Sequence, residues 1–329
     1  MNECIIGVDL GGTRLRVAQI DRDMNIVDRK EILTLASQGS ESTIERMKEM
    51  IRQMLPTDSN TLVTGIGISA PGPSNPNTGV VVAPPNLPGW HNVPLVQILQ
   101  KEFGYSTYLG NDANVAALAE IARGAARGYR HVIFITVSTG IGGGVVSDGR
   151  LLLGKDGLGA ELGHIQMIVD GDHVSSLEKE AAGPALARKA VAAMQAGQAS
   201  IMRDMVSGDL TQVNGSTVGE AAANGDALAL SIVERAGFIL GLGMVTFLHV
   251  FNPEIIVFGG GVSTLGDLLF NPMRDAIRKH ALDSSYWETL EIRPAELGEN
   301  VSLVGAAALV VTKGGVEDVG TVARKLDKD

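Results

Sequence analysis

The sequence predicts a duplicated α/β fold that holds phosphate between its two halves. Three glycine-rich turns, at 9–13, 138–144 and 259–261, each follow an apolar, strand-like run. Glycine lets backbone amides close around a phosphate without a side chain in the way, so such turns suit nucleotide binding. In the first two turns one strand enters and a second strand leaves. Two copies of this unit indicate an internal duplication.

Length and composition agree with a two-domain protein. The chain has 329 residues and is 45% apolar, which is enough for two cores. Its net charge of −10 argues against a nucleic-acid partner. The single cysteine, Cys4, lies in an apolar strand, so no disulfide can form within the chain. We find neither an apolar run of membrane-span length nor a signal peptide, and therefore expect a cytoplasmic protein with no membrane partner.

Elements of the first half alternate between strands and helices. A helix is expected over 42–55, because Ile44, Met47 and Ile51 recur at helical spacing and Pro56 follows. The loop 75–90 is rich in Pro, Asn and Gly, and its length suggests a functional role. The other expected elements are strands at 5–8, 15–20, 25–28, 64–69 and 106–109 and helices at 95–103 and 113 to about 127.

The second half continues this alternation and returns to the first. Strands are expected at 132–137 and 255–258, with a short hairpin after the second turn, and helices at 177 to about 196, 218–224, 228–251 and 305 to about 312. The last helix is too short and apolar to stand alone, so we expect it to pack back on the first domain. The predicted domains are 1–112 with about 303–329, and 113–302.

The first glycine turn carries the most specific chemical signal. Asp9 ends a strand and is followed by Gly11, Gly12 and Thr13. An acidic residue, two glycines and a hydroxyl in this order can position Mg²⁺ through water and wrap amides around a transferring phosphate. The sequence has neither a G-x-G-x-x-G that opens a helix after the first strand nor a Walker loop. The phosphate chemistry therefore belongs to another fold.

Asp112 is the candidate general base. The run Asn111-Asp112-Ala113-Asn114 joins a strand end to a helix start. Aspartate is also a good helix N-cap, and the two interpretations can coexist if one residue caps while Asp112 faces a cleft. Phosphorylation of an alcohol needs a carboxylate within hydrogen-bond reach of the hydroxyl.

Polar groups downstream suit a sugar. Glu161 and His164 lie in a glycine-rich segment, and with Asn111 and Glu178 they would present donors and acceptors to sugar hydroxyls. A single histidine is more often structural than catalytic. Charged groups in an apolar context cost stability unless they bind something.

These motifs occur in the order seen in the ROK family of sugar kinases and repressors, and the chain resembles that family over nearly its whole length. The resemblance is greatest to bacterial glucokinases and implies the duplicated actin/hexokinase-like (ribonuclease H-like) ATPase fold. It implies that Asp9, Gly11, Gly12 and Thr13 form the phosphate–Mg²⁺ turn and that Asp112 is the base. It further implies a second phosphate turn and an adenosine contact, made by Thr139, Gly140, Gly142, Gly260 and Gly261. The implied sugar ligands are Gly72, Asn86, Asn111, Asp112, Glu161, His164 and Glu178.

One departure from the family concerns zinc. Many ROK members carry a zinc site after the Glu-Leu-Gly-His motif, built from that histidine and three cysteines, but residues 165–177 contain no cysteine. A substitute site from His164, His173 and Asp170 or Asp172 is conceivable, although such spacing arises readily by chance. We therefore expect no zinc, and a compact turn over 169–174.

The resemblance implies Mg-ATP as cofactor and phosphorylation of a hexose, with glucose to glucose 6-phosphate as the leading reaction and Mg-ATP in an interdomain cleft. The alternatives are another hexose (N-acetylmannosamine, fructose or mannose) and polyphosphate as donor. A sugar-sensing regulator would need a DNA-binding segment ahead of the first strand, and here the strand begins at once. A homodimer or higher homo-oligomer is expected from the family.

Overall fold

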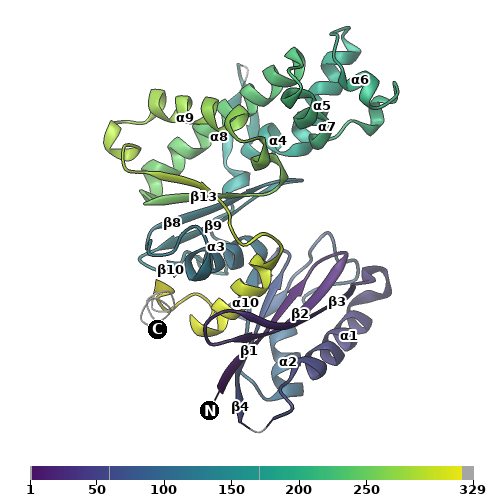
Figure 1. Ribbon diagram of the computed structural model, residues 1–329, viewed down its shortest axis with the longest axis vertical. Coiled ribbons are helices and arrows are strands. Elements are labelled where there is room, and N and C mark those ends of the chain that lie inside the picture. The colour runs from purple at the N-terminus through teal and green to yellow at the C-terminus, as the bar shows by residue number, and fades with distance from the viewer. Residues whose placement is uncertain (1, 59, 170, 321–329) are drawn as a thin grey trace. The chain divides into compact units, whose positions relative to one another are not determined.

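The chain folds into two compact units in this computed structural model, which describes residues 2–58, 60–169 and 171–320. Unit 1 comprises Met1–Phe134, Gly144–Ala160 and Ala295–Asp329, and unit 2 comprises Ile135–Gly143 and Glu161–Pro294. Figure 1 labels the elements along the chain. The domain limits expected from the sequence remain a prediction.

Unit 1 is built on a five-stranded sheet with the order β3-β2-β1-β4-β7. β1 (Asn2–Leu10) pairs antiparallel with β2 (Arg14–Asp21) and parallel with β4 (Thr61–Ala70). β3 (Ile26–Leu33) and β7 (Thr107–Asn111) form the two edges. The register places Asp9 beside Ser69 and Ala70 beside Asn111. The acidic turn and the start of the next helix therefore meet at one end of this sheet.

One face of the sheet is covered by α1 (Gly39–Met54) and α2 (Leu95–Phe103) (Figure 1). The apolar positions that predict α1 are the ones it buries, and they share a core with alternate residues of β1 and β4 such as Ile6 and Ile68. The 75–90 loop contains two short paired strands, β5 (Ser74–Asn75) and β6 (Val80–Val81). Its Trp90 is fully buried in the same core, which fixes the loop to the sheet.

α10 (Val301–Val311) packs on the other face of this sheet, as the sequence predicts, although the helix starts four residues earlier than expected. Glycines make the close approach possible. A Cβ on Gly67 would lie 1.7 Å from the carbonyl oxygen of Ala306, and one on Gly305 would lie 2.1 Å from that of Val115. Val115 belongs to α3 (Asp112–Arg123), which packs along α10. The helix backbone thus lies directly on the sheet and on α3.

The second sheet has the order β10-β9-β8-β13-β14. A separate hairpin is formed by β11 and β12. The strands are β8 (Val132–Val137), β9 (Ile141–Ser147), β10 (Arg150–Leu151), β11 (Gln166–Val169), β12 (His173–Ser176), β13 (Ile255–Gly259) and β14 (Glu291–Pro294). The helices of unit 2 are α4 (Leu177–Ala181), α5 (Gly183–Gln195), α6 (Met202–Met205), α7 (Gly215–Ala223), α8 (Ala227–Phe251) and α9 (Asp267–His280).

α8 is the central helix of unit 2 and packs along α9 (Figure 1). By length and composition alone, α8 could cross a membrane. The expectation that the chain has no apolar run of membrane-span length was therefore wrong. Of its most apolar stretch, 61% is buried inside the protein. Gly237 and Gly241 face the backbone carbonyls of Leu269 and Met273 on α9. Its apolar surface is thus used in the core of unit 2.

Several boundaries differ from the sequence prediction. The helix expected over 177–196 is two helices, because Ala182 adopts extended backbone angles between α4 and α5. The second glycine turn is shorter than expected, since β9 already begins at Ile141. Residues 169–174 lie in the β11–β12 hairpin, of which Asp170 is outside the described residues. α9 and β14 were not predicted, although Leu269, Met273 and Ile277 give α9 a buried stripe.

Glu120 anchors the segment that leads into α10. Its side chain is fully buried on α3. One carboxylate oxygen accepts the backbone N–H of Ala125 at 2.8 Å, and the carboxylate also accepts the N–H groups of Glu296 and Leu297 at 3.2 Å. These two N–H groups precede the helical segment that runs from Gly298, so the carboxylate lies at the positive end of a helix dipole.

We expect Glu120→Ala to lower the free energy of unfolding of unit 1 by about 3 kcal/mol, because buried N–H groups would lose their acceptor. Chemical denaturation followed by hydrogen exchange at 295–300 measures this. Glu45→Gln is the matched control, since Glu45 is exposed and pairs with Lys48 on the surface of α1. Equal stability of the two variants would contradict the anchoring role.

Candidate functional site

A pocket of about 380 Å³ lies at the end of the sheet in unit 1. It gathers the first glycine turn, the candidate base and a residue of the long loop. Its lining residues are Asp9, Leu10, Gly11, Gly12, Thr13, Arg14, Arg16, Ser69, Ala70, Pro71, Asn86, Asp112 and Ser302. The structure therefore brings together six of the residues that the sequence singled out: Asp9, Gly11, Gly12, Thr13, Asn86 and Asp112.

Asp9 is held by an arginine that the sequence analysis did not identify. The guanidinium of Arg16 places Nε 2.8 Å and Nη2 2.6 Å from Oδ2 of Asp9, and its Nη1 donates to the carbonyl of Glu299 at 2.8 Å. The side chain of Ser302, on α10, is a further hydrogen-bond partner of Asp9. Burial raises the pKa of Asp9, and the charge and hydrogen bonds of Arg16 oppose this rise without cancelling it.

The glycine turn itself is tightly closed. The N–H of Gly11 donates to the carbonyl of Arg14 at 2.9 Å, and the hydroxyl of Thr34 donates to the carbonyl of Gly11 at 2.6 Å. A Cβ on Gly12 would lie 2.8 Å from the carbonyl oxygen of Asn86. Glycine at this position therefore lets Asn86 lie against the turn.

Asn111 caps the helix α3, whereas Asp112 lies at the wall of the pocket. Asn111 is the N-cap of α3, and its Oδ1 accepts the N–H of Asn114 at 2.7 Å. Asp112 is the first helical residue, with Oδ1 2.8 Å from the N–H of Ala113. Its side chain is exposed and lines the pocket. Capping by the asparagine leaves the aspartate at the pocket wall.

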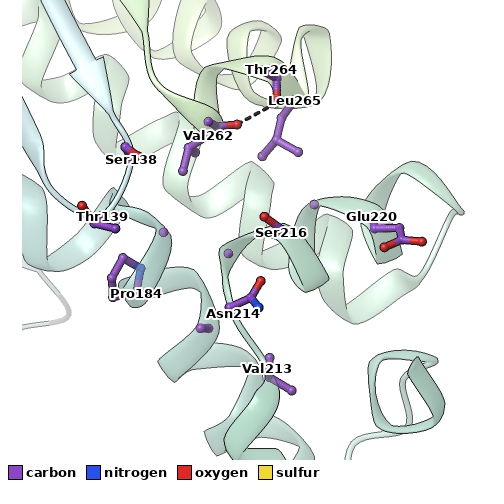
Figure 2. A pocket seen from close by; sticks show the side chains of 15 residues that line it. Ser138, Thr139, Pro184, Val213, Asn214, Ser216, Glu220, Val262, Thr264 and Leu265 are labelled. Atoms are coloured by element: carbon purple, nitrogen blue, oxygen red, sulfur yellow. Dashed lines mark hydrogen bonds between the residues drawn. The ribbon is translucent and has the colours of Figure 1, made fainter. Parts of the chain in front are cut away.

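Unit 2 contains a larger pocket of about 720 Å³, which Figure 2 shows. It joins the second and third glycine turns to the starts of two helices. Its lining residues are Ser138, Thr139, Gly183, Pro184, Ala187, Val213, Asn214, Gly215, Ser216, Gly219, Glu220, Gly261, Val262, Thr264 and Leu265. Thr139 and Gly261 are thus brought together as predicted nucleotide contacts.

The break between α4 and α5 shapes this pocket. The N–H of Gly183 donates to the carbonyl of Ser138 at 2.8 Å, which fixes the start of α5 to the second turn. A Cβ on Gly215 would lie 2.9 Å from the Cα of Gly183, so the start of α7 reaches the start of α5 only because both residues are glycines. Pro184 suits the first turn of α5, where no intrahelical N–H bond is needed.

Two helix starts at one pocket favour an anion. α7 begins with a capping box in which Asn214 Oδ1 accepts the N–H of Thr217 at 3.0 Å. α5 has no side-chain cap. The N-terminal end of a helix carries partial positive charge, which suits phosphate. In Figure 2, Asn214 and Ser216 lie at the start of α7, and Thr264 is tied to the carbonyl of Gly261 by a 2.7 Å hydrogen bond.

Three other predicted nucleotide residues lie outside the lining of this pocket. Gly260 has a φ of +87°, and a Cβ there would lie 2.4 Å from the carbonyl oxygen of Val137. Only glycine fits this close approach. Gly140 lies against the carboxylate of Glu178, and Gly142 is part of β9. Their roles as nucleotide contacts remain predictions.

Glu161, His164 and Glu178 lie in neighbouring segments of unit 2. Glu161 and His164 are exposed at the two ends of a single 3₁₀ turn, and this turn packs against α4, which carries Glu178. Glu178 Oε2 accepts the N–H of Ile141 at 2.8 Å, so one oxygen is already engaged by the second glycine turn. Gly72 lies in unit 1, where a Cβ would meet no atom within 4 Å.

Some of the pocket residues that the sequence did not predict are marked by local sequence signals, and others are not. Asn214-Gly215-Ser216-Thr217 has the pattern of a capped helix start, and Gly183-Pro184 has the pattern of a helix break followed by a first turn. Arg16, Ser69 and Ser302 carry no motif of their own. They reach the pocket only through strand register and through the packing of α10.

No cluster of three or more His, Cys, Asp or Glu suited to a metal occurs within residues 2–58, 60–169 and 171–320. His173 is on β12, in the hairpin that follows His164. Asp170, one of the alternative ligands considered for zinc, lies outside the described residues.

Comparisons with known proteins identify the family. Residues 5–313 match the model of the ROK family. This chain belongs to the ROK family. It is 36% identical over 311 residues to a glucokinase from Thermotoga maritima, covering 93% of this chain and 96% of the relative.

Solved structures of ROK kinases are similar to this chain in fold and sequence. A ROK hexokinase from Thermus thermophilus superposes with a TM-score of 0.78 at 32% identity, covering 94% of this chain and 100% of that one. A ROK family glucokinase from Streptomyces griseus, in complex with glucose and AMPPNP, gives a TM-score of 0.73 at 29% identity, with coverage of 93% and 98%. The chain has the actin/hexokinase-like fold of ROK sugar kinases, and it is a sugar kinase.

The raised pKa of Asp9 predicts a pH-dependent effect on stability. The folded protein binds this proton more tightly than the unfolded chain, where the pKa is about 3.9. The resulting stabilisation is present below that value and is lost as pH rises through the folded pKa. Asp9→Asn removes this loss, so at neutral pH we expect a higher melting temperature than for wild type.

Thermal unfolding between pH 4 and pH 8 checks this, with Asp28→Asn on β3 as the exposed control. A melting temperature of Asp9→Asn below wild type at neutral pH would show instead that pairing with Arg16 outweighs burial.

Proposed function

We propose that this ROK kinase transfers the γ-phosphoryl group of ATP to the 6-hydroxyl of glucose. The observation that carries the proposal is the pocket of unit 1, in which an exposed aspartate and a glycine-rich phosphate turn line the same cavity. A carboxylate and a ring of phosphate-binding groups at one place are what phosphorylation of an alcohol requires.

Asp112 serves as the general base in this proposal. Its position at the start of α3 is fixed by the asparagine cap before it, and its side chain is exposed to the pocket. It accepts the proton of the sugar hydroxyl as the oxygen attacks phosphorus. The bond from that oxygen to the γ-phosphorus forms while the bond to the leaving ADP oxygen breaks, and the proton moves to the Asp112 carboxylate.

The first glycine turn and Arg16 balance the charge of the transferring group. Gly12 and Thr13 would present backbone and hydroxyl donors, Gly11 closes the turn, and the Arg16 guanidinium adds a fixed positive charge in the same pocket. Preorganised donors of this kind stabilise charge that develops in the transition state.

The residues of this pocket fit a magnesium ion that is held mainly by nucleotide phosphates and water. Asp9 and Asp112 supply the hard carboxylate oxygens that Mg²⁺ prefers, and Mg²⁺ in kinase sites is bound by one or two carboxylates. When bound, the ion would neutralise phosphate charge.

ATP is the donor favoured by the pocket of unit 2. Its volume of about 720 Å³ lies within the range of nucleotide-sized sites, and it combines apolar surface with Asn214, Ser216 and Thr264. Polyphosphate has no base or ribose and needs no such cavity. Polyphosphate is the alternative phosphoryl donor, and another hexose is the alternative acceptor.

We further propose, from the family resemblance, that the sugar ligands are Gly72, Asn86, Asn111, Glu161, His164 and Glu178. Asn86 lies against the phosphate turn, and Asn111 precedes the base directly. The exposed Glu161 and His164 offer a charge and a ring nitrogen for sugar hydroxyls. A cytoplasmic location and a homodimer or higher homo-oligomer complete the proposal.

Asp112→Asn should lower kcat by about 10²- to 10⁴-fold, because the amide cannot accept the hydroxyl proton. Glucose binding, measured by isothermal titration calorimetry, should stay within a few-fold of wild type. Asp283→Asn is the matched control, since Asp283 likewise accepts a backbone N–H next to a short helical turn, but outside the pocket. A variant at Asp112 with near wild-type turnover would exclude the base role.

Gly261→Leu tests the nucleotide pocket. Gly261 lines the pocket and a Cβ there would meet no protein atom within 4 Å, so we expect a leucine to enter the pocket with little effect on the fold. We expect the KM for ATP to rise about 10- to 100-fold while the melting temperature stays near wild type. Steady-state kinetics with ATP and with polyphosphate distinguish the donors. An unchanged KM for ATP would place the nucleotide elsewhere.

A further inference from the structure

The β11–β12 hairpin connects two segments that carry proposed sugar ligands. It begins at Gln166, two residues after His164 ends the 3₁₀ turn, and it finishes at Ser176, two residues before Glu178. The N–H of Leu177 donates to the carbonyl of Ile165 at 3.2 Å and closes the base of the hairpin. Gln166 Nε2 donates to the carbonyl of His164 at 2.9 Å. The position of the hairpin therefore bears directly on His164 and Glu178.

A chain of three polar side chains fastens this hairpin to the helices. Ser175 of β12 is buried, and its hydroxyl donates to Glu180 Oε1 on α4 at 2.8 Å. Lys189 of α5 donates to Glu180 Oε2 at 2.7 Å and to the backbone carbonyl of Glu180 at 2.9 Å. The carboxylate thus links one strand and two helices. Burial raises the pKa of the Glu180 carboxyl, but the hydrogen bonds from Lys189 and Ser175 lower it, and the net result is that the pKa of Glu180 lies below its usual value.

The inner side of the turn that carries Glu161 and His164 is packed too closely to shift freely. A Cβ on Gly163 would lie 2.0 Å from the carbonyl oxygen of Ile141, and Leu162 is buried against Gly143. The turn is therefore held from one side by β9. On the other side its continuation is the hairpin, whose outward face carries the exposed Ile168 and Val174. The hairpin needs its own anchor.

We propose that Ser175, Glu180 and Lys189 are positioning residues that set His164 and Glu178 for sugar binding. This inference rests on the proposed function. The three residues act through the hairpin and through α4, and none of them lines either pocket. A partly buried, charge-assisted hydrogen-bond chain fixes geometry more firmly than neutral contacts do, and small displacements of positioning groups have large effects on binding and rate.

The test compares Ser175→Ala and Glu180→Gln with Lys189→Arg, which keeps the charge, and with Asp275→Asn, which removes a surface pair with Arg278 on α9. For Ser175→Ala and Glu180→Gln we expect the KM for glucose to rise about five- to tenfold, while the KM for ATP stays within twofold of wild type. Lys189→Arg and Asp275→Asn should behave as wild type. Melting temperatures are recorded in parallel.

The proposal would be overturned if Ser175→Ala and Glu180→Gln left the KM for glucose unchanged, or raised the KM values for glucose and ATP in parallel. It would also be overturned if the change in KM followed only the change in melting temperature. One tightly bound zinc per chain in metal analysis, with sugar affinity lost to a zinc-selective chelator in excess Mg²⁺, would overturn it as well, since a metal would then do the positioning. If wild type phosphorylates no hexose, the proposed function fails. Hydrogen exchange at 161–165 then decides: faster exchange in Ser175→Ala supports the anchor, and unchanged exchange excludes it.

Discussion

The approach of α10 to the sheet of unit 1 is the contact on which the rest of that unit depends. Backbone meets backbone at Gly67 and Gly305, because a side chain at either position would overlap a carbonyl oxygen. Close packing of this kind leaves no room for adjustment. It brings Ser302 to Asp9 and the Glu299 carbonyl to Arg16, although these residues are nearly 300 positions apart. The first glycine turn therefore takes its geometry from contacts with α10 and the residues before it, and Glu120 secures the entry to that helix.

The two pockets differ in the source of the positive charge that they offer to an anion. The pocket of unit 1 holds a partly buried ion pair, in which burial works against the charge of Asp9 and Arg16 supports it. The pocket of unit 2 lies at the starts of α5 and α7, whose helix dipoles supply the positive potential. The first arrangement suits a transferring group whose charge changes, and the second suits a nucleotide that stays bound.

Much of the fold could be predicted from the sequence because its signals are local. The strands before each glycine turn, the α1 stripe and α2 follow from apolar spacing and from Pro or Gly at their ends. The break at Ala182 was missed although Gly183-Pro184 marks it locally, whereas its attachment to the second glycine turn could not be predicted, because the N–H of Gly183 donates to the carbonyl of Ser138, 45 residues earlier. Asp9, Asn86 and Asp112 were predicted by motif and resemblance. Arg16 and Ser302 were not, since strand register and helix packing alone bring them to the pocket.

The most direct test of the account is ADP release by the purified protein with Mg-ATP, measured across a panel of hexoses. We expect rapid, ATP-dependent turnover with glucose, with phosphate located on the 6-oxygen of the product. Turnover only with another hexose, or only with polyphosphate, would keep the fold but contradict the assigned substrates. No turnover with any donor and acceptor pair would contradict phosphoryl transfer to a sugar, and with it the roles given to Asp112 and to both pockets.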